Sequence, residues 1–538
     1  MKTKIFLTLL LSYALTSFAQ TLREAIKQTT NEQFETADVS FKALLQTSPN
    51  SGEVYFYYGE NFFKNENPEM AKAMYQKGSE LNATNPLCHV GLGKILWYDK
   101  KDKEAMTEFY TAKSLSTTGK DANLVMQAKV LMEIADVYIN APIKNIQEAM
   151  TALNQALKLE PKNAKIYLLM GDAYLAQNNI SSGTEANKQY EKAMELEPGS
   201  AAATLRIGKL YGRSNPNLAL DYYKKAIEKD PVFAPAYREK AEILFKAGRY
   251  NDAVADYKKF LELNNNMSAR VRYIGFLYQA KQYKEAITQG MEIFNKDSGN
   301  VVLYRYLGYS YFENAEYPNG SNKMESFFRK AEGKIKIIPL DYEYYGKLLA
   351  KTGKDSLGVI ALLKAISLDS SKTDLYGELG SAYYKMKKYS EAIAAYKKKM
   401  AASGKSGAND YFSMGRAYYF AKDFMNADSC FAQVTRLSID YPTGYLWRAK
   451  SNAQQEGSST EKGMAKPHYE IFISKIKPEE TEKNKKDLID ANTYLGVYYA
   501  KNKDYKTAKT YFAKVVELDP ANENAKKFMD SKEAKEVK

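Results

Sequence analysis

The chain has 538 residues, too many for one compact core, so it contains either several domains or an array of repeats. Its 26% of charged residues and modest content of Pro and Gly exclude an intrinsically disordered chain. The formal net charge of +14 favours acidic partners, anionic lipid or nucleic acid.

Residues 1–19 are typical of a secretory signal peptide. Lys2 and Lys4 precede a short apolar run, and a small-x-small cleavage site ends at Ala19, which leaves Gln20 as the first mature residue. The run is too short to span a membrane comfortably, and no later segment approaches the roughly 18 apolar residues that a spanning helix needs. We therefore expect an exported protein, periplasmic or peripherally attached to the envelope. Export argues against a nucleic-acid partner.

A repeat begins directly after this segment and continues almost to the end of the chain. The regular copies have Gly or Ala, then Ala twelve residues later, then an aromatic residue four further on, and undistorted copies are 34 or 35 residues apart. Other copies have an altered loop between the two halves, and two weaker copies centre near Ile134 and Ile274. We count about fourteen copies. The clearest structural positions of the repeat are Gly59, Ala71, Gly93, Ala105, Gly308, Gly380, Ala392, Gly415, Ala427, Gly496, Ala508 and Pro520.

Each copy is predicted to form two helices of about 12–14 residues. The small residue on the first helix lets it approach the alanine of the second, and aromatic side chains three or four residues away fill the gaps on either side. A proline soon after the second helix ends it. One pair cannot bury its own apolar face, so neighbouring pairs stack and share a core.

This pattern resembles the tetratricopeptide repeat (TPR). The stretches LGSAY at 379–383 and AKTYFA at 508–513 match its two helices well. The resemblance implies an all-α fold, an α-α superhelix of about fourteen helix-turn-helix repeats, whose first helices line a concave groove. It covers nearly all of residues 20–530.

The predicted organisation follows from where the pattern is regular. After the signal peptide we expect a TPR array over 20–476 with about thirteen repeats, a charged irregular connector over 477–487, a C-terminal repeat over 488–530 and a polar tail over 531–538. Insertions in several turns between paired helices would emerge along one edge of the array. They are either part of a binding edge or tolerated surface variation.

The resemblance also predicts a groove, at fixed offsets from the small residue of each first helix. The side chains that we expect there are Trp97, Tyr98, Arg238, Phe245, Arg305, Tyr309, Phe312, Tyr384, Lys385, Phe412, Arg416 and Tyr419. An aromatic and basic groove suits an extended or helical peptide that carries acidic groups. The alternative is that some of these aromatics pack between neighbouring first helices and that some of the lysines only maintain solubility.

The sequence offers no catalytic chemistry. The only histidines, His89 and His468, lack the neighbours that a metal site needs, and Cys88 and Cys430 are expected to be buried thiols. No phosphate-binding, nucleophile or zinc-protease motif occurs. We therefore predict no enzyme, and no catalytic, metal-binding or cofactor-binding residues.

The leading hypothesis is a protein-interaction scaffold of the bacterial cell envelope that binds partner polypeptides through its groove and loop edge. The signal and the Lys- and Tyr-rich composition resemble exported proteins of Bacteroidetes-type bacteria, some of which act in secretion, motility or outer-membrane assembly. The alternative is a glycan-binding, TPR-containing outer-membrane accessory protein, which would stack sugars on aromatics such as Trp97. That group usually has a lipid-anchor cysteine and a large insertion, and this chain has neither. The sequence leaves the oligomeric state open.

Overall fold

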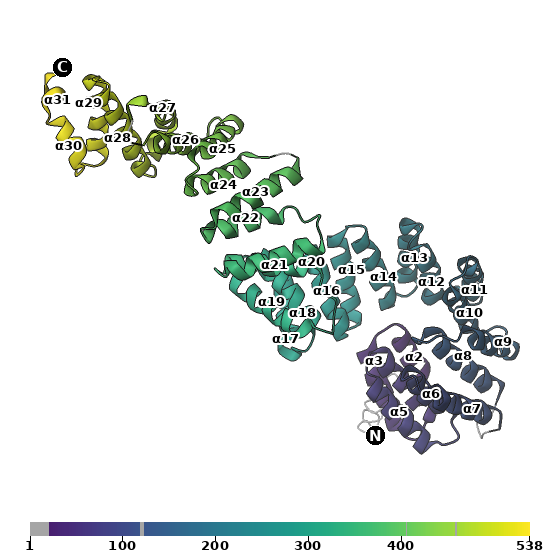
Figure 1. The fold of residues 1–538 in the computed structure, drawn as a ribbon. Coiled ribbons are helices and arrows are strands. Elements are labelled where there is room, and N and C mark those ends of the chain that lie inside the picture. The colour runs from purple at the N-terminus through teal and green to yellow at the C-terminus, as the bar shows by residue number, and fades with distance from the viewer. Residues whose placement is uncertain (1–20, 119–122, 405, 458–459, 538) are drawn as a thin grey trace, which may run out of the picture. The chain divides into compact units, whose positions relative to one another are not determined.

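The computed structural model describes residues 21–118, 123–404, 406–457 and 460–537 (Figure 1). The predicted signal peptide lies outside these residues. Every regular element of the described part is a helix, and α2 to α29 form fourteen consecutive helix pairs. The predicted all-α repeat fold is thus confirmed. The chain divides into two compact units between Ser298 and Gly299.

The first unit contains eight of the described pairs. Their helices are α2 (Leu22–Thr30), α3 (Phe34–Thr47), α4 (Gly52–Lys64), α5 (Pro68–Leu81), α6 (Pro86–Tyr98), α7 (Asp102–Thr118), α8 (Leu124–Asn140), α9 (Ile146–Leu159), α10 (Ala164–Gln177), α11 (Ser182–Leu196), α12 (Ala201–Tyr211), α13 (Pro216–Lys229), α14 (Ala234–Lys246), α15 (Tyr250–Leu263), α16 (Met267–Gln279) and α17 (Tyr283–Lys296).

The second unit contains the other described pairs and two short helices after them. Its elements are α18 (Val301–Glu313), α19 (Tyr317–Ala331), α20 (Pro339–Lys351), α21 (Asp355–Leu368), α22 (Leu375–Lys385), α23 (Tyr389–Ser403), α24 (Ala408–Phe420), α25 (Phe424–Leu437), α26 (Pro442–Glu456), η1 (Thr460–Lys462), α27 (Lys466–Lys475), η2 (Pro478–Glu480), α28 (Lys485–Lys501), α29 (Tyr505–Leu518), α30 (Glu523–Met529) and α31 (Lys532–Glu536).

In most pairs that have a first-helix glycine, this glycine faces an aromatic ring of the second helix at close range. A Cβ added to Gly59 would lie 2.2 Å from Cε1 of Tyr75, and one added to Gly380 would lie 2.5 Å from Cε1 of Tyr396. Both partners lie sixteen residues after the glycine. The missing side chain therefore makes room for an aromatic ring, whereas the sequence suggested that it brings two backbones together at the alanine.

In eleven of the described pairs the turn contains a left-handed residue, seven residues after the first-helix position that the repeat assigns to the small residue. Gly248 and Gly353 take this conformation easily. In most other pairs a non-glycine residue adopts it. These residues are Glu32, Glu66, Lys100, Asn178, Lys281, Ala315, Lys387, Lys422 and Lys503. The repeated geometry fixes how each second helix returns along the first.

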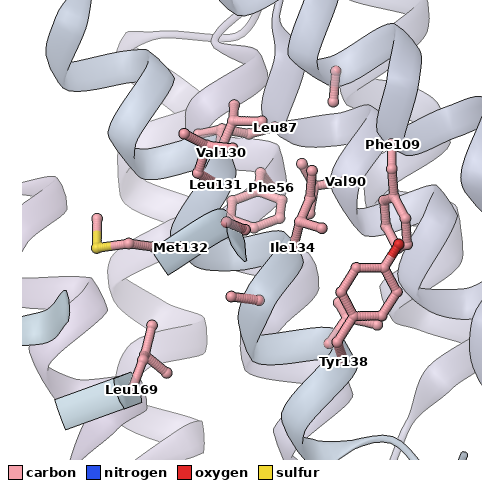
Figure 2. Close-up of a cluster of buried hydrophobic side chains, with 14 of the residues drawn as sticks. Phe56, Leu87, Val90, Phe109, Val130, Leu131, Met132, Ile134, Tyr138 and Leu169 are labelled. Atoms are coloured by element: carbon pink, nitrogen blue, oxygen red, sulfur yellow. The ribbon is translucent and has the colours of Figure 1, made fainter. Parts of the chain in front are cut away.

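Neighbouring pairs share a continuous apolar core. In the first unit, Phe109 and Tyr138 meet edge to face with ring centroids 5.5 Å apart, and Val90 and Ile134 lie beside them (Figure 2). These side chains come from α6, α7 and α8. Stacking of neighbouring pairs therefore buries the apolar side chains that a single pair would leave exposed to water.

The first unit also makes contacts across about two hundred residues. The backbone N–H of Ala234 donates to Asn31 O at 3.3 Å, and Asn266 Nδ2 donates to Asn65 Oδ1 at 2.9 Å. Ser268 donates to Glu66 at 2.6 Å. The ends of α2 and α4 thus contact the starts of α14 and α16, so the array of this unit returns onto its own first repeats.

The segments predicted to be a charged connector and a polar tail both contain short helical stretches. Within the expected connector 477–487, η2 is followed by α28, which begins at Lys485. In the expected tail 531–538, Ser531 caps α31 by accepting from the N–H of Ala534, and Ala534 is fully buried. A small apolar residue at this place is enough to dock a short polar helix.

We expect Gly171→Ala to lower the free energy of unfolding by about 1–3 kcal/mol, because its Cβ would lie 2.3 Å from Cε1 of Tyr190. Gly183 belongs to the same helix pair and has open space around its Cβ position. Gly183→Ala should be neutral or should stabilise by up to about 1 kcal/mol. Urea denaturation of both variants tests this, and equal stabilities would contradict it.

Candidate functional site

The first helices of the first unit are joined by buried ion pairs. Lys94 Nζ lies 2.8 and 2.7 Å from the two carboxylate oxygens of Glu60 and 3.8 Å from Asp136, and Tyr75 donates to Glu60 at 2.7 Å. Burial lowers the pKa of Lys94, but the negative charges of Glu60 and Asp136 outweigh it and raise this pKa above its ordinary value. Lys94 is therefore a structural cation.

The same arrangement continues along the array. Arg206 makes a two-pronged contact with Asp172 at 2.9 Å, and Tyr190 donates to the same carboxylate at 2.7 Å. Lys209 pairs with Glu239 at 3.1 Å. Each pair links one first helix to the next, so much of the charge on this face is already compensated.

A hollow of about 620 Å³ opens among the first helices of this unit. Arg206 and Arg238 line it together with their partners Asp172 and Glu32. Lys64 and Lys144 line it too and are exposed. The predicted groove residue Arg238 thus lies at the hollow, with its guanidinium bound to Glu32 across the contact of α2 with α14.

The aromatic residues predicted for the groove of the first unit pack between helices. Trp97 is only 6% exposed, and its indole N–H donates to Ile143 O at 2.9 Å. Tyr98 packs on Phe63, with ring centroids 5.0 Å apart. Phe245 lies against the neighbouring first helix α16, beneath the guanidinium of Arg272. Trp97 therefore offers little surface for the sugar stacking that the glycan alternative requires.

On α18 the predicted groove residues also contact the next first helix. Arg305 pairs with Asp341 at 2.7 Å, and Tyr309 donates to the same carboxylate at 2.6 Å. The Tyr309 ring stacks on Tyr344 at 4.3 Å, and Phe312 meets Tyr344 edge to face at 5.3 Å. These side chains hold α18 against α20.

The remaining predicted residues lie on α22 and α24, next to Trp447 of α26. Arg416 lies 4.8 Å from the ring centroid of Tyr384 and 5.8 Å from that of Trp447, and its Nη2 donates to the Tyr384 hydroxyl at 2.8 Å. Tyr419 and Phe412 meet Trp447 edge to face at 5.1 and 6.3 Å. The guanidinium is therefore held between aromatic walls, which we call the Arg416 site.

Arg416 differs from the buried basic residues of the first unit. Among the described residues, no carboxylate lies within ion-pair distance of it, and its Nε has no hydrogen-bond partner. Lys450 lies beside the same Trp447 ring but pairs with Asp487 at 2.7 Å. Lys385, at the edge, lies 3.7 Å from Asp355. The Nε itself is buried, so a carboxylate would have to meet the remaining guanidinium N–H groups, and a guanidinium fixed in this way is suited to that contact.

Sequence reasoning missed Trp447, which lies two residues before the small residue Ala449. The groove offsets did not include this position. Arg206, Glu239 and Tyr344 lie at the same offset, and each contacts the neighbouring first helix. The sequence signal that could have identified Trp447 is this repeated position, two residues before the small residue of each first helix.

The described residues contain no cluster of three His, Cys, Asp or Glu side chains placed to hold a metal ion. Cys88 and Cys430 are buried free thiols, and burial raises their pKa to about 12 and about 11. His89 contacts Glu108 at 2.7 Å. The same described part holds no helix with the length and hydrophobicity to cross a bilayer.

Comparison with known families identifies the repeat. Models of the tetratricopeptide repeat match residues 209–268, 238–290, 373–398 and 489–522, and a TPR repeat model matches residues 144–178. This chain belongs to the tetratricopeptide repeat proteins. Such TPR arrays are in general non-catalytic scaffolds that bind other proteins.

Similar proteins share parts of this TPR chain. Protein SGT1 homolog of Bos taurus is 40% identical over 74 residues, 13% of this chain and 22% of that protein. Protein O-mannosyl-transferase TMTC3 of Homo sapiens is 23% identical over 229 residues, 40% of this chain and 24% of that protein. The chain thus spans about a quarter or less of these two relatives.

Among solved structures, the C-terminal part of a TPR repeat-containing protein from Cytophaga hutchinsonii is 33% identical. The match covers 48% of this chain and 100% of that one, with a TM-score of 0.42.

We expect Lys94→Met to lower the free energy of unfolding by about 3–5 kcal/mol, because it leaves the carboxylate of Glu60 buried without its cation. Lys192→Met is the matched control. It breaks a pair with Glu195 in which both side chains are at least half exposed, and it should change the stability little, because solvent screens an exposed pair. Chemical denaturation compares them. An equal loss in the free energy of unfolding for both variants would contradict the prediction that removing the buried cation is the more destabilising change.

Proposed function

We propose that this TPR protein is a non-catalytic scaffold of the bacterial cell envelope that binds a partner polypeptide through an acidic group at the Arg416 site. The observation that carries the proposal is the guanidinium of Arg416, which lies between the rings of Tyr384 and Trp447 without a carboxylate partner among the described residues. A guanidinium without a carboxylate partner is costly to keep between aromatic walls unless a ligand uses it.

The surroundings of the site suit a peptide. Phe420 is 42% exposed and lies 6.2 Å from Trp447 and 5.8 Å from Tyr384. It provides an apolar surface for the side chains that flank a bound carboxylate. The hydroxyl of Tyr384 already fixes one edge of the guanidinium, so a ligand would meet a preorganised donor.

The place of action rests on the first 19 residues, which have the basic, apolar and small-residue segments of a secretory signal. Export would place the scaffold in the periplasm or on the envelope. There we propose that it supports secretion, motility or outer-membrane assembly by holding partner proteins together.

Arg416→Ala should reduce recovery of the partner about tenfold or more, because a hydrogen bond to a charged group contributes about 1.5–3 kcal/mol. The measurement is affinity purification of the full chain from cross-linked envelopes, with quantitative mass spectrometry. Arg416→Lys should recover only part of the binding, since an ammonium cannot replace a planar, stacked guanidinium.

Arg436→Ala is the matched control for that experiment. Arg436 is exposed on α25, the second helix of the same pair, and does not belong to the Arg416 site. It should leave recovery unchanged. Equal recovery with Arg416→Ala, Arg436→Ala and the unaltered chain would refute the proposed site.

Processing at the N-terminus is a separate prediction. The native protein isolated from cells should begin at Gln20, because the small-x-small site ends at Ala19. N-terminal peptide sequencing and the intact mass measure this. Retention of residues 1–19 in the mature protein would contradict export by this signal and would leave the Arg416 prediction intact.

A further inference from the structure

The second helix α21 presents a row of apolar side chains on its surface. Leu357 is 53% exposed, Ile360 64%, Leu363 45% and Leu368 49%. Leu357, Ile360 and Leu368 follow one face of the helix over three turns, about 16 Å. Exposed apolar residues scattered singly are normal, but a contiguous row marks an interaction site.

The repeat itself supplies the comparison that makes this row unusual. Leu357, Ile360 and Leu363 lie one before, two after and five after Gly358, which takes the place of the repeat alanine. At the same offsets, several other second helices carry only exposed polar or small residues. In α9 they are Glu148, Thr151 and Asn154, and in α23 they are Glu391, Ala394 and Lys397. The helices α3, α5 and α7 each carry a single exposed apolar residue at these offsets, Val39, Met70 and Tyr110. The fold therefore does not require apolar side chains here.

The row borders a cleft of about 680 Å³ among α19, α20 and α21. Phe328 lies 4.8 Å from Tyr342 and 4.9 Å from Tyr345, measured between ring centroids, and these three rings line the cleft with Leu349. The surface is thus recessed and aromatic, with aliphatic side chains along one wall. A recess of this length suits a helix better than a flat bilayer surface.

The charge of the cleft narrows the choice of partner. Lys364 is the charged residue among the described lining residues, and no carboxylate lines the cleft or pairs with this lysine there. Lys364 lies between Ile360 and Leu368 on the same face of α21. A second copy of this chain would bring the same patch, with another lysine and no carboxylate. The complementary partner carries an acidic group.

We propose that this cleft binds an amphipathic helix of another protein, whose apolar stripe covers Leu357, Ile360 and Leu368 and whose carboxylate meets Lys364. The cleft lies on second helices, whereas the Arg416 site lies on first helices. The inference therefore goes beyond the proposed function, and each site can be tested without the other.

The test is selection of helices from a displayed peptide library. Its members have about 16 residues, a fixed Leu/Ile stripe at the spacing i, i+3, i+4, i+7 and randomised flanking positions. The target is the full chain. We expect enriched peptides to carry Glu or Asp at a flank, and Lys364→Glu to shift the enrichment toward Lys and Arg.

Two substitutions at exposed apolar positions complete the design. Ile360→Asp should weaken the selected peptides about tenfold or more, because it places a charge at the centre of the apolar row. Met425→Asp is the matched control, since Met425 is 69% exposed on α25 and lies outside the cleft. It should leave binding unchanged, as should Arg416→Ala.

The proposal is overturned if no helix is enriched, if the enriched helices bind the Ile360→Asp variant equally well, or if Lys364→Glu leaves the flanking preference unchanged. Two further measurements identify other occupants. Self-association in sedimentation that Ile360→Asp abolishes would assign the cleft to a second copy. Binding to vesicles of anionic phospholipid that Ile360→Asp abolishes would assign it to a membrane surface. Either result would replace the proposed partner.

Discussion

The contact that recurs along both units is the insertion of a second-helix side chain, most often an aromatic ring, into the space that a first-helix glycine leaves open. Gly59 with Tyr75 and Gly380 with Tyr396 show it at the same sixteen-residue spacing in both units. A ring is large enough to contribute most of the apolar contact within a pair, and the glycine decides where it lies. This contact fixes the distance between the two helices of a pair. The turn that joins them and the stacking of the next pair follow from it, because each pair must meet a neighbour of the same shape.

That constraint explains why the fold could be predicted and the site only in part. The small residue, the alanine and the ring are local in sequence, so their spacing identifies most of the pairs. The groove depends on residues of different repeats, and a single offset rule cannot tell a side chain that faces solvent from one that faces the next first helix. Tyr309 lies one residue after its glycine and Tyr384 lies four residues after its own, and both were predicted to face the groove. In the structure, Tyr309 is buried against Tyr344, whereas the hydroxyl of Tyr384 accepts a hydrogen bond from Arg416.

Charge illustrates the same limit. The sequence predicted a basic groove because Lys and Arg outnumber acids at the chosen offsets. In the structure, Lys94, Arg238 and Arg305 have carboxylate partners on other repeats or on the turns between helices. Buried pairs of this kind contribute little net stability, but removing one partner is costly, so they favour one arrangement of neighbouring helices over its alternatives. The net charge of the chain therefore says little about which cations remain available to a ligand.

A repeat array can keep its core spacing and still vary the exposed positions of each pair independently, since stability comes mainly from contacts within a pair and with its neighbours. The second unit shows two such departures, a guanidinium without a carboxylate on α24 and an apolar row on α21. The first would bind its ligand through hydrogen bonds between charged groups, and the second through buried apolar area. Salt should therefore weaken binding at the Arg416 site far more than binding at the cleft beside α21. Two partners held on one rigid unit gain a high effective concentration for each other without touching the same residues. A scaffold needs no more chemistry than this, because its effect on a reaction or an assembly is to replace an encounter in solution by an encounter on one surface.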